Sequence, residues 1–131
     1  RVIIFNYIIG NADAHGKNFS FLIKRNAIHL APFYDLLSTE AYPNLSKKMA
    51  MKIGDKYNPK EVFKRHWHRF ADDISVSPSL VDKEIKYMLN MFKKHAESVA
   101  NNYSMPYKQS DVISRILKII SNNMDHLKEK L

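Results

Sequence analysis

Residues 10–35 read GNADAHGKNFSFLIKRNAIHLAPFYD, and this stretch decides how the first part of the chain folds. It starts with a polar segment that holds an Asp, a His, a Lys and two Asn. Two strand-like runs follow, Phe19–Lys24 and Ile28–Tyr34, and the first alternates with the period of two that strands show. Asn26 tolerates the left-handed conformation of a tight turn. We therefore predict a polar loop followed by an antiparallel hairpin that turns at Asn26-Ala27.

The predicted hairpin brings two polar side chains together at its open end. With a turn at Asn26-Ala27, Asn18 lies opposite Asp35, and opposed Cα atoms are about 4.5–5.5 Å apart. Amide and carboxylate oxygens are ligands that Mg²⁺ takes, with water and phosphates completing the octahedron. The prediction depends on the register, because a one-residue slip would move one side chain to the other face.

Three other residues of the polar loop suggest phosphoryl transfer. Asp13 is ionised at neutral pH and can accept a proton from a hydroxyl. Lys17 supplies a positive charge for a phosphoryl group, and His15 could bind phosphate or support the loop. A base, metal ligands and a cation are the parts that phosphoryl transfer requires, since its catalysis is mostly positioning and charge neutralisation.

The rest of the chain predicts a helical scaffold. The apolar segment 1–9 indicates a buried helix, and Lys48–Ile53 alternates like a third strand that ends at Gly54-Asp55. Residues 58–131 indicate three helices, which start at a capping box at Asn58, at Ser77-Pro78 and at Ser110. The expected fold class is mainly α with a small antiparallel sheet. We expect one domain over 1–131, with the loop and hairpin in 1–57 and the scaffold in 58–131.

Composition excludes several kinds of site. The 131 residues include no Cys, which rules out disulfides, thiolate zinc sites and cysteine nucleophiles. The net charge is +8, but the basic residues are spread out, so we expect solvated helix faces and no direct nucleic-acid binding. The absence of Cys is compatible with a cytoplasmic protein, which we expect. The apolar start is too short to span a bilayer, so we expect no membrane contact. Because the sequence begins inside an apolar helix without a cap, we also expect an upstream part.

The motifs together resemble a known family. Asp-x-His-x-Lys-Asn at 13–18, followed by Pro-Phe-Tyr-Asp-Leu-Leu-Ser at 32–38, is similar to the C-terminal lobe of HipA-like serine/threonine kinases, the toxins of bacterial toxin–antitoxin pairs. The segments 5–11 and 48–54 and the triplet Arg65-His66-Trp67 also resemble that family. The resemblance covers roughly residues 1–75 and implies the C-terminal lobe of a protein-kinase-like fold.

The resemblance implies a role for each motif residue. Asp13 would be the catalytic base that activates a serine or threonine hydroxyl. Asn18 would hold Mg²⁺, and Asp35 would take the place of the metal-binding Asp of the kinase Asp-Phe-Gly motif. Lys17 would lie near the transferred phosphate of ATP. The implied partners are a protein substrate, in known cases an aminoacyl-tRNA synthetase, and an antitoxin.

The sequence also departs from a complete kinase. It has only three Gly and neither a glycine-rich phosphate loop nor a strand Lys with a helix Glu partner, which belong to the N-terminal lobe. We therefore expect this lobe to be missing and the 131-residue chain alone to transfer no phosphate.

Two other functions remain open. Phosphatidylinositol kinases share the Asp-x-His-x-x-Asn spacing, but residues 39–47 lack the basic or apolar insertion that a membrane-facing lipid kinase should show. A non-catalytic basic module that binds a protein or nucleic acid is the second alternative. The scaffold residues His66 and His68 are expected to pack or to lie at the surface, and the Met residues to fill the core.

Overall fold

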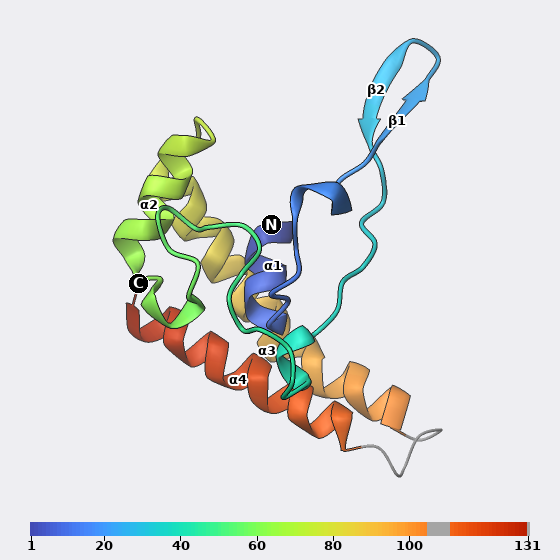
Figure 1. Cartoon of the computed structure of the whole chain (residues 1–131), viewed down its shortest axis with the longest axis vertical. Helices are drawn as coiled ribbons and strands as arrows, with labels where there is room; N and C mark the ends of the chain where they lie inside the picture. The colour runs from blue at the N-terminus through green and yellow to red at the C-terminus, as the bar shows by residue number, and fades with distance from the viewer. Residues whose placement is uncertain (105–110, 131) are drawn as a thin grey trace.

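The helical body encloses helix α1. The computed structural model describes residues 1–104 and 111–130. Helix α1 (Val2–Ile9) contacts both α3 (Pro78–Ser104) and α4 (Val112–Lys130), and α2 (Lys64–Asp73) packs on α3. Figure 1 shows α1 surrounded by these helices, with the hairpin pointing away from the body. None of the described helices is both long and apolar enough to cross a membrane.

The core forms around α1 because its apolar side chains face the other helices. Ile8 is fully buried, and Tyr7 packs edge-on against Trp67 of α2, with ring centroids 5.5 Å apart. The Tyr7 hydroxyl donates a hydrogen bond of 2.8 Å to the Pro59 carbonyl, and burial raises the pKa of this phenol. The Asn123 amide of α4 donates to the carbonyls of Tyr7 and Ile8, which satisfies acceptors near the end of α1.

The hairpin forms with a different register from the predicted one. Strands β1 (Phe21–Lys24) and β2 (Ala27–Leu30) pair antiparallel with Lys24 opposite Ala27. The turn is therefore Arg25-Asn26, and both residues have positive φ, of 47° and 64°, as a type I′ turn requires. The predicted turn at Asn26-Ala27 is wrong. The error shifts the pairing by two residues, so side chains keep their faces.

The third predicted strand, Lys48–Ile53, does not form. Its backbone finds separate partners: Met49 N–H donates to Tyr57 O at 2.8 Å, and Ala50 N–H donates to Ala12 O at 2.7 Å. Ile53 pairs only with Lys56 in an isolated bridge. Residues 48–53 are therefore irregular chain, and their hydrogen bond from Ala50 to Ala12 joins them to the loop after α1.

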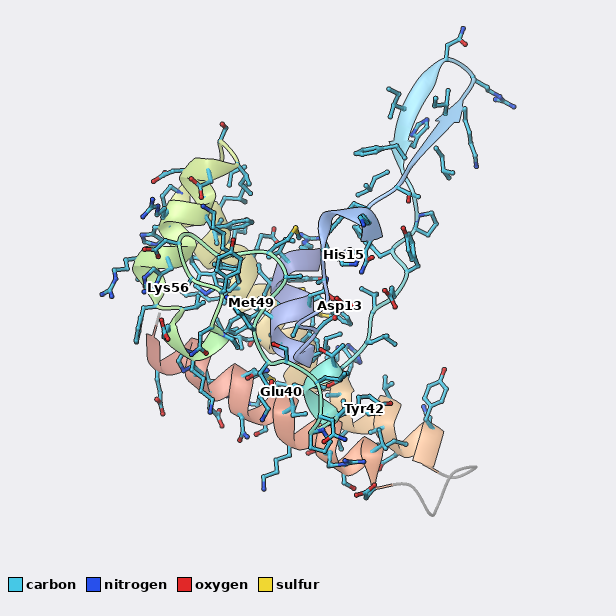
Figure 2. The ribbon with its side chains drawn as sticks, viewed as in Figure 1. Asp13, His15, Glu40, Tyr42, Met49 and Lys56 are labelled. Atoms are coloured by element: carbon cyan, nitrogen blue, oxygen red, sulfur yellow. The ribbon has the colours of Figure 1, made fainter. Side chains whose placement is uncertain are left out.

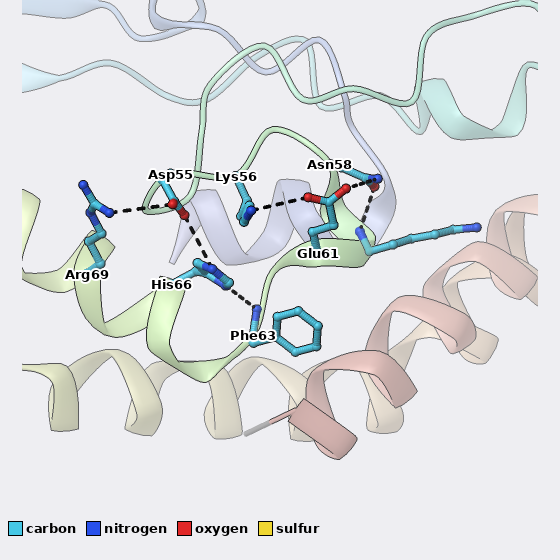
Figure 3. A network of polar contacts seen from close by, with 8 residues as sticks. Asp55, Lys56, Asn58, Glu61, Phe63, His66 and Arg69 are labelled. Carbon is cyan, nitrogen blue, oxygen red and sulfur yellow. Dashed lines mark hydrogen bonds and ion pairs between the residues drawn. The ribbon is translucent and has the colours of Figure 1, made fainter.

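The helix predicted from Asn58 starts later. Asn58 Oδ1 accepts from Lys60 N–H, but this cap closes only the short 3₁₀ turn η3 (Pro59–Glu61). Helix α2 begins at Lys64, where His66 Nδ1 accepts the Phe63 N–H at 2.9 Å (Figure 3). The start of α3 at Pro78 agrees with the prediction, and the predicted cap Ser110 lies outside the described residues.

The two scaffold histidines make structural contacts. His66 is buried, its Nε2 lies 3.5 Å from an Asp55 carboxylate oxygen, and Arg69 approaches the same carboxylate (Figure 3). Burial, followed by the charge of Arg65, lowers the pKa of His66. His68 Nε2 lies 3.0 Å from Asp82 of α3. His66 therefore joins α2 to the segment of Asp55, and His68 joins α2 to α3. Their expected role in packing or at the surface agrees with these contacts.

Candidate active site

The candidate catalytic loop, residues 10–18, begins where α1 ends at Gly10. Gly10 has a φ of 70°, and the Asn11 N–H bonds back to the Asn6 carbonyl at 2.8 Å. A Cβ on Gly10 would lie 2.8 Å from Ile119 Cγ2 and 2.9 Å from Glu40 Oε2. Glycine is therefore required both by the left-handed conformation and by the close packing. This turn directs the chain out of the core and into the loop that carries Asp13.

Asn18 connects the two acidic residues of the site. It ends the 3₁₀ turn η1 (Gly16–Asn18), and its Nδ2 lies 3.3 Å from Asp35 Oδ2 and 3.5 Å from the Asp13 carbonyl. Figure 2 shows Asp13 on the loop between α1 and the hairpin. The predicted convergence of Asn18 and Asp35 is confirmed.

The two side chains meet by a route that the sequence did not indicate. The ladder ends at the bond from Ala31 N–H to Ser20 O, before either residue. Pro32 follows and has no N–H to donate, so the chain leaves the ladder there. Asp35 then adopts a φ of 57°, a left-handed conformation that Asp tolerates better than most residues. This turn in the backbone, and not strand pairing, brings Asp35 to Asn18.

Tyr34 fixes the other side of the loop. Its hydroxyl donates to the Lys17 carbonyl at 2.7 Å and lies 3.2 Å from Ser20 Oγ. The Lys17 side chain is exposed. This contact holds η1 against the segment of Asp35. It was not predicted, because Tyr34 belongs to a run of residues that is typical of a strand.

The donor set fits a magnesium nucleotide. Asp35 is an exposed carboxylate beside the Asn18 amide, and Asp13 is an exposed carboxylate on the same loop as Asn18. No cluster of three His, Cys, Asp or Glu side chains suited to a metal occurs in residues 1–104 and 111–130. Mg²⁺ in phosphoryl-transfer sites uses one or two carboxylates together with substrate phosphates. Within the same described residues, His15 Nδ1 and Ser38 Oγ are buried without a hydrogen-bond partner. Such atoms can serve a ligand.

Beneath the site lie polar side chains to which the sequence analysis gave no role. Thr39, in the 3₁₀ turn η2 (Thr39–Ala41), is buried; its Oγ1 accepts the Ala12 N–H at 2.8 Å and donates to the Gly10 carbonyl at 3.2 Å. Asn6 and Asn11 are also buried. Asn6, within the apolar run of α1, could have indicated these buried polar residues, because a buried amide requires polar partners.

Known proteins resemble this chain in sequence and in fold. The model of the HipA-like C-terminal domain family matches residues 1–103. The chain is 48% identical over 97 residues to the protein named "Putative kinase Y4mE" of Sinorhizobium fredii, covering 74% of this chain and 22% of that protein. It is 35% identical over 78 residues to the serine/threonine-protein kinase toxin HipA of Shewanella oneidensis, covering 60% of this chain and 18% of that protein.

A solved structure shares the fold. It is the complex of Shewanella oneidensis HipA with HipB and operator DNA, whose HipA-type fold matches with a TM-score of 0.82 at 22% identity, over 98% of this chain and 30% of that chain. This chain therefore shares the fold of that structure, and it is mainly helical with a two-stranded antiparallel sheet. The family model matches residues 1–103, which is most of this chain, so the chain belongs to the HipA-like C-terminal domain family.

Proposed function

We propose that this chain is the catalytic and metal-binding part of a serine/threonine protein kinase of the toxin type. The observation that carries the proposal is the meeting of Asn18 with Asp35 and the Asp13 backbone at one exposed point. In this proposal Asp13 supplies the base, Asn18 and Asp35 supply the oxygen ligands, and the exposed Lys17 on the same loop supplies the cation. The relatives' names, a kinase and a kinase toxin, support the same reaction.

Each residue has a chemical task in this proposal. The exposed Asp13 carboxylate accepts the proton of a serine or threonine hydroxyl as that oxygen attacks the γ-phosphorus of ATP. The bond from the γ-phosphorus to the β–γ bridging oxygen breaks at the same time, and ADP leaves. The Asp35 carboxylate and Asn18 Oδ1 hold Mg²⁺; an amide can present either its oxygen or its nitrogen by rotation. When bound, Mg²⁺ neutralises charge on the phosphates. Lys17 attracts the transferred phosphoryl group, and His15, with its buried Nδ1, supports the loop.

The proposal includes partners and a missing part. The HipA relative with a solved structure is in complex with HipB, and we propose an antitoxin partner for the protein that contains this chain. The phosphorylated partner would be a protein, with an aminoacyl-tRNA synthetase as the first candidate, acting in the cytoplasm. The nucleotide-binding N-terminal lobe lies outside residues 1–131, so we expect the chain alone to transfer no phosphate from ATP.

The test is a chimera. The chain replaces the matching C-terminal part of Shewanella oneidensis HipA, and transfer of labelled γ-phosphate to serine or threonine is measured. We expect transfer by the chimera and a loss of about 100-fold or more in Asp13→Asn, since general base catalysis contributes roughly 10²–10⁴-fold. Asp73→Asn, an exposed Asp at the end of α2, is the matched control and should keep activity.

Two results would contradict the proposal. One is a chimera with the native circular dichroism spectrum that transfers no phosphate. The other is an Asp13→Asn chimera as active as Asp73→Asn. Strong autophosphorylation by the 131-residue chain alone would separately contradict the assignment of the nucleotide clamp to another lobe.

A further inference from the structure

Asn11 is the buried residue that contacts both active-site segments. Its side chain is 6% exposed and lies at the start of the catalytic loop, directly after the turn at Gly10. Its Oδ1 accepts the Asp13 N–H at 3.2 Å. Its Nδ2 donates to the Asp35 carbonyl at 3.1 Å and to Asn6 Oδ1 at 3.0 Å. Both amide hydrogens and the oxygen are therefore engaged.

These partners fix the orientation of the Asn11 amide. The Asp13 N–H can only donate and the Asp35 carbonyl can only accept. A flipped amide would place N–H against N–H and oxygen against oxygen, which would cost both bonds in a buried position. Asn6 Oδ1 accepts the second hydrogen and holds the amide plane in place. We call the hydrogen-bonded pair Asn6–Asn11 the Asn11 bracket. Its burial and hydrogen bonds fix the orientation of the Asn11 amide, which would rotate freely on a surface.

The bracket is the middle one of three links between the loop of Asp13 and the segment of Asp35. At one end, Thr39 and the Glu40 N–H bind Gly10 and Ala12. At the exposed end, Asn18 reaches Asp35. Between them, Asn11 alone among these residues contacts the peptide groups of both Asp13 and Asp35.

The backbone of Asp35 needs such support. Its φ of 57° is a left-handed conformation, which is unfavourable for a residue with a Cβ because the Cβ comes close to the following carbonyl oxygen. Strain of this kind persists at functional sites only where surrounding contacts hold it. The bond from Asn11 Nδ2 to the Asp35 carbonyl is a contact of that kind.

We propose that Asn11 is a positioning residue that sets the separation of Asp13 and Asp35, with Asn6 orienting it. The inference rests on the proposed function for its chemical meaning. Asn11 touches no substrate or metal; it acts through the two peptide groups that carry the base and the metal ligand. Residues that orient metal ligands in this way typically change metal affinity by about 10- to 100-fold when substituted.

The matched variants are Asn11→Ala and Asn123→Ala. Each removes one amide that donates to backbone carbonyls: Asn11 donates to Asp35, and Asn123 donates to Tyr7 and Ile8. Only Asn11 contacts the site, because Asn123 binds Tyr7 and Ile8 from α4. Asn11→Asp is a third variant: it keeps the shape and the acceptor for Asp13 N–H but loses both donors.

Two readouts on the ¹⁵N-labelled 131-residue chain test the inference. The first is the position of the Asn18 side-chain amide and Asp35 backbone resonances. The second is the affinity for Mn²⁺ alone, a paramagnetic substitute for Mg²⁺, from the broadening of the Asn18 resonance. We expect both Asn11 variants to shift these resonances and to weaken Mn²⁺ binding by about 10- to 100-fold. Asn123→Ala should leave both readouts unchanged.

The outcomes separate the inference from the function on which it rests. If Asn11→Ala and Asn11→Asp keep the wild-type resonances and Mn²⁺ affinity, or if Asn123→Ala changes them equally, the positioning role is wrong. If wild type and Asp35→Asn bind Mn²⁺ equally, the proposed metal site is wrong. The Asn18 and Asp35 resonances would still decide whether Asn11 holds the two segments together.

Discussion

Helix α1 and the β1–β2 hairpin are both apolar, but the protein buries one and exposes the other. Ile8 of α1 has 0% exposure, whereas Ile23 of β1 has 79%. The pairing places four exposed apolar side chains on one face of the hairpin: Phe21, Ile23, Ile28 and Leu30. Hydrophobicity therefore does not decide burial; burial requires a second surface to pack against.

The candidate site lies at the boundary between these two regions. Asp13 follows the buried helix, while Asn18 precedes the exposed hairpin and Asp35 follows it. The hydrogen bonds of Asn11 and Thr39 reach the site from the packed side. A two-stranded hairpin is only marginally stable by itself. We infer that the helical body, and not the hairpin, fixes the geometry of the site.

The largest expected effect comes from the buried region. Ile8→Ala removes three carbons from a fully buried side chain and leaves a cavity between α1 and the other helices. Such substitutions lower the free energy of unfolding by about 2–5 kcal/mol. Urea denaturation followed by circular dichroism measures the change. A loss below about 1 kcal/mol would mean that the core relaxes around α1 and that the contrast with the hairpin is overstated.

The second largest loss of stability is expected at the boundary between α1 and the loop that follows it. Gly10→Ala forces a Cβ into a residue with φ of 70° and against Ile119 and Glu40, so we expect a loss of about 1–3 kcal/mol in the free energy of unfolding. Gly16→Ala in η1 is the matched control, because a Cβ there meets no atom within 4 Å. Equal losses in the two variants would show that the turn after α1 is not tightly packed.

A smaller effect should appear as pH dependence in the body. Because burial lowers the pKa of His66, the unfolded chain binds a proton at a higher pH than the folded chain does. The stability contribution is complete above the unfolded pKa, about 6.5, and is lost as the pH falls below it. One proton changes the free energy of unfolding by at most about 1.4 kcal/mol per pH unit.

The His66 effect is measured by difference. Unfolding by urea at pH 7.5 and at pH 5.5 is compared between wild type and His66→Asn, which can still accept the Phe63 N–H. We expect wild type to lose more stability on acidification than the variant. Identical losses would show that His66 is not the group responsible.

Features that follow from local sequence patterns were predicted well. Helix α1, the hairpin and the start of α3 at Pro78 follow from apolar periodicity and capping chemistry, and the resemblance to HipA-like proteins is confirmed by the family model. The mainly α fold class with a small antiparallel sheet is confirmed as well. These features are local, so short segments of sequence determine them.

Two kinds of feature were not predicted: the exact turn of the hairpin, and contacts between residues far apart in the sequence. The turn at Arg25-Asn26 requires positive φ at both residues, and nothing local in Arg25 indicates it. The segment from Lys48 alternates like a strand but bonds to Ala12 and Tyr57 instead. The bracket of Asn11 joins residues 24 positions apart and became visible only in the fold. The roles of Asp13, His15, Lys17, Asn18 and Asp35, and the division of the chain at residue 57, stay predictions.

The smallest expected effect comes from the exposed hairpin and is the sharpest test of the comparison. Ile23→Ala deletes the same atoms as Ile8→Ala, but at a position where Ile23 pairs only across the hairpin with Ile28. Surface substitutions of this kind change the free energy of unfolding by less than about 0.5 kcal/mol. A loss near that of Ile8→Ala would mean that the apolar face is covered in solution. Repeating the measurement at two protein concentrations would then distinguish covering by a second copy, which depends on concentration, from packing within one chain, which does not.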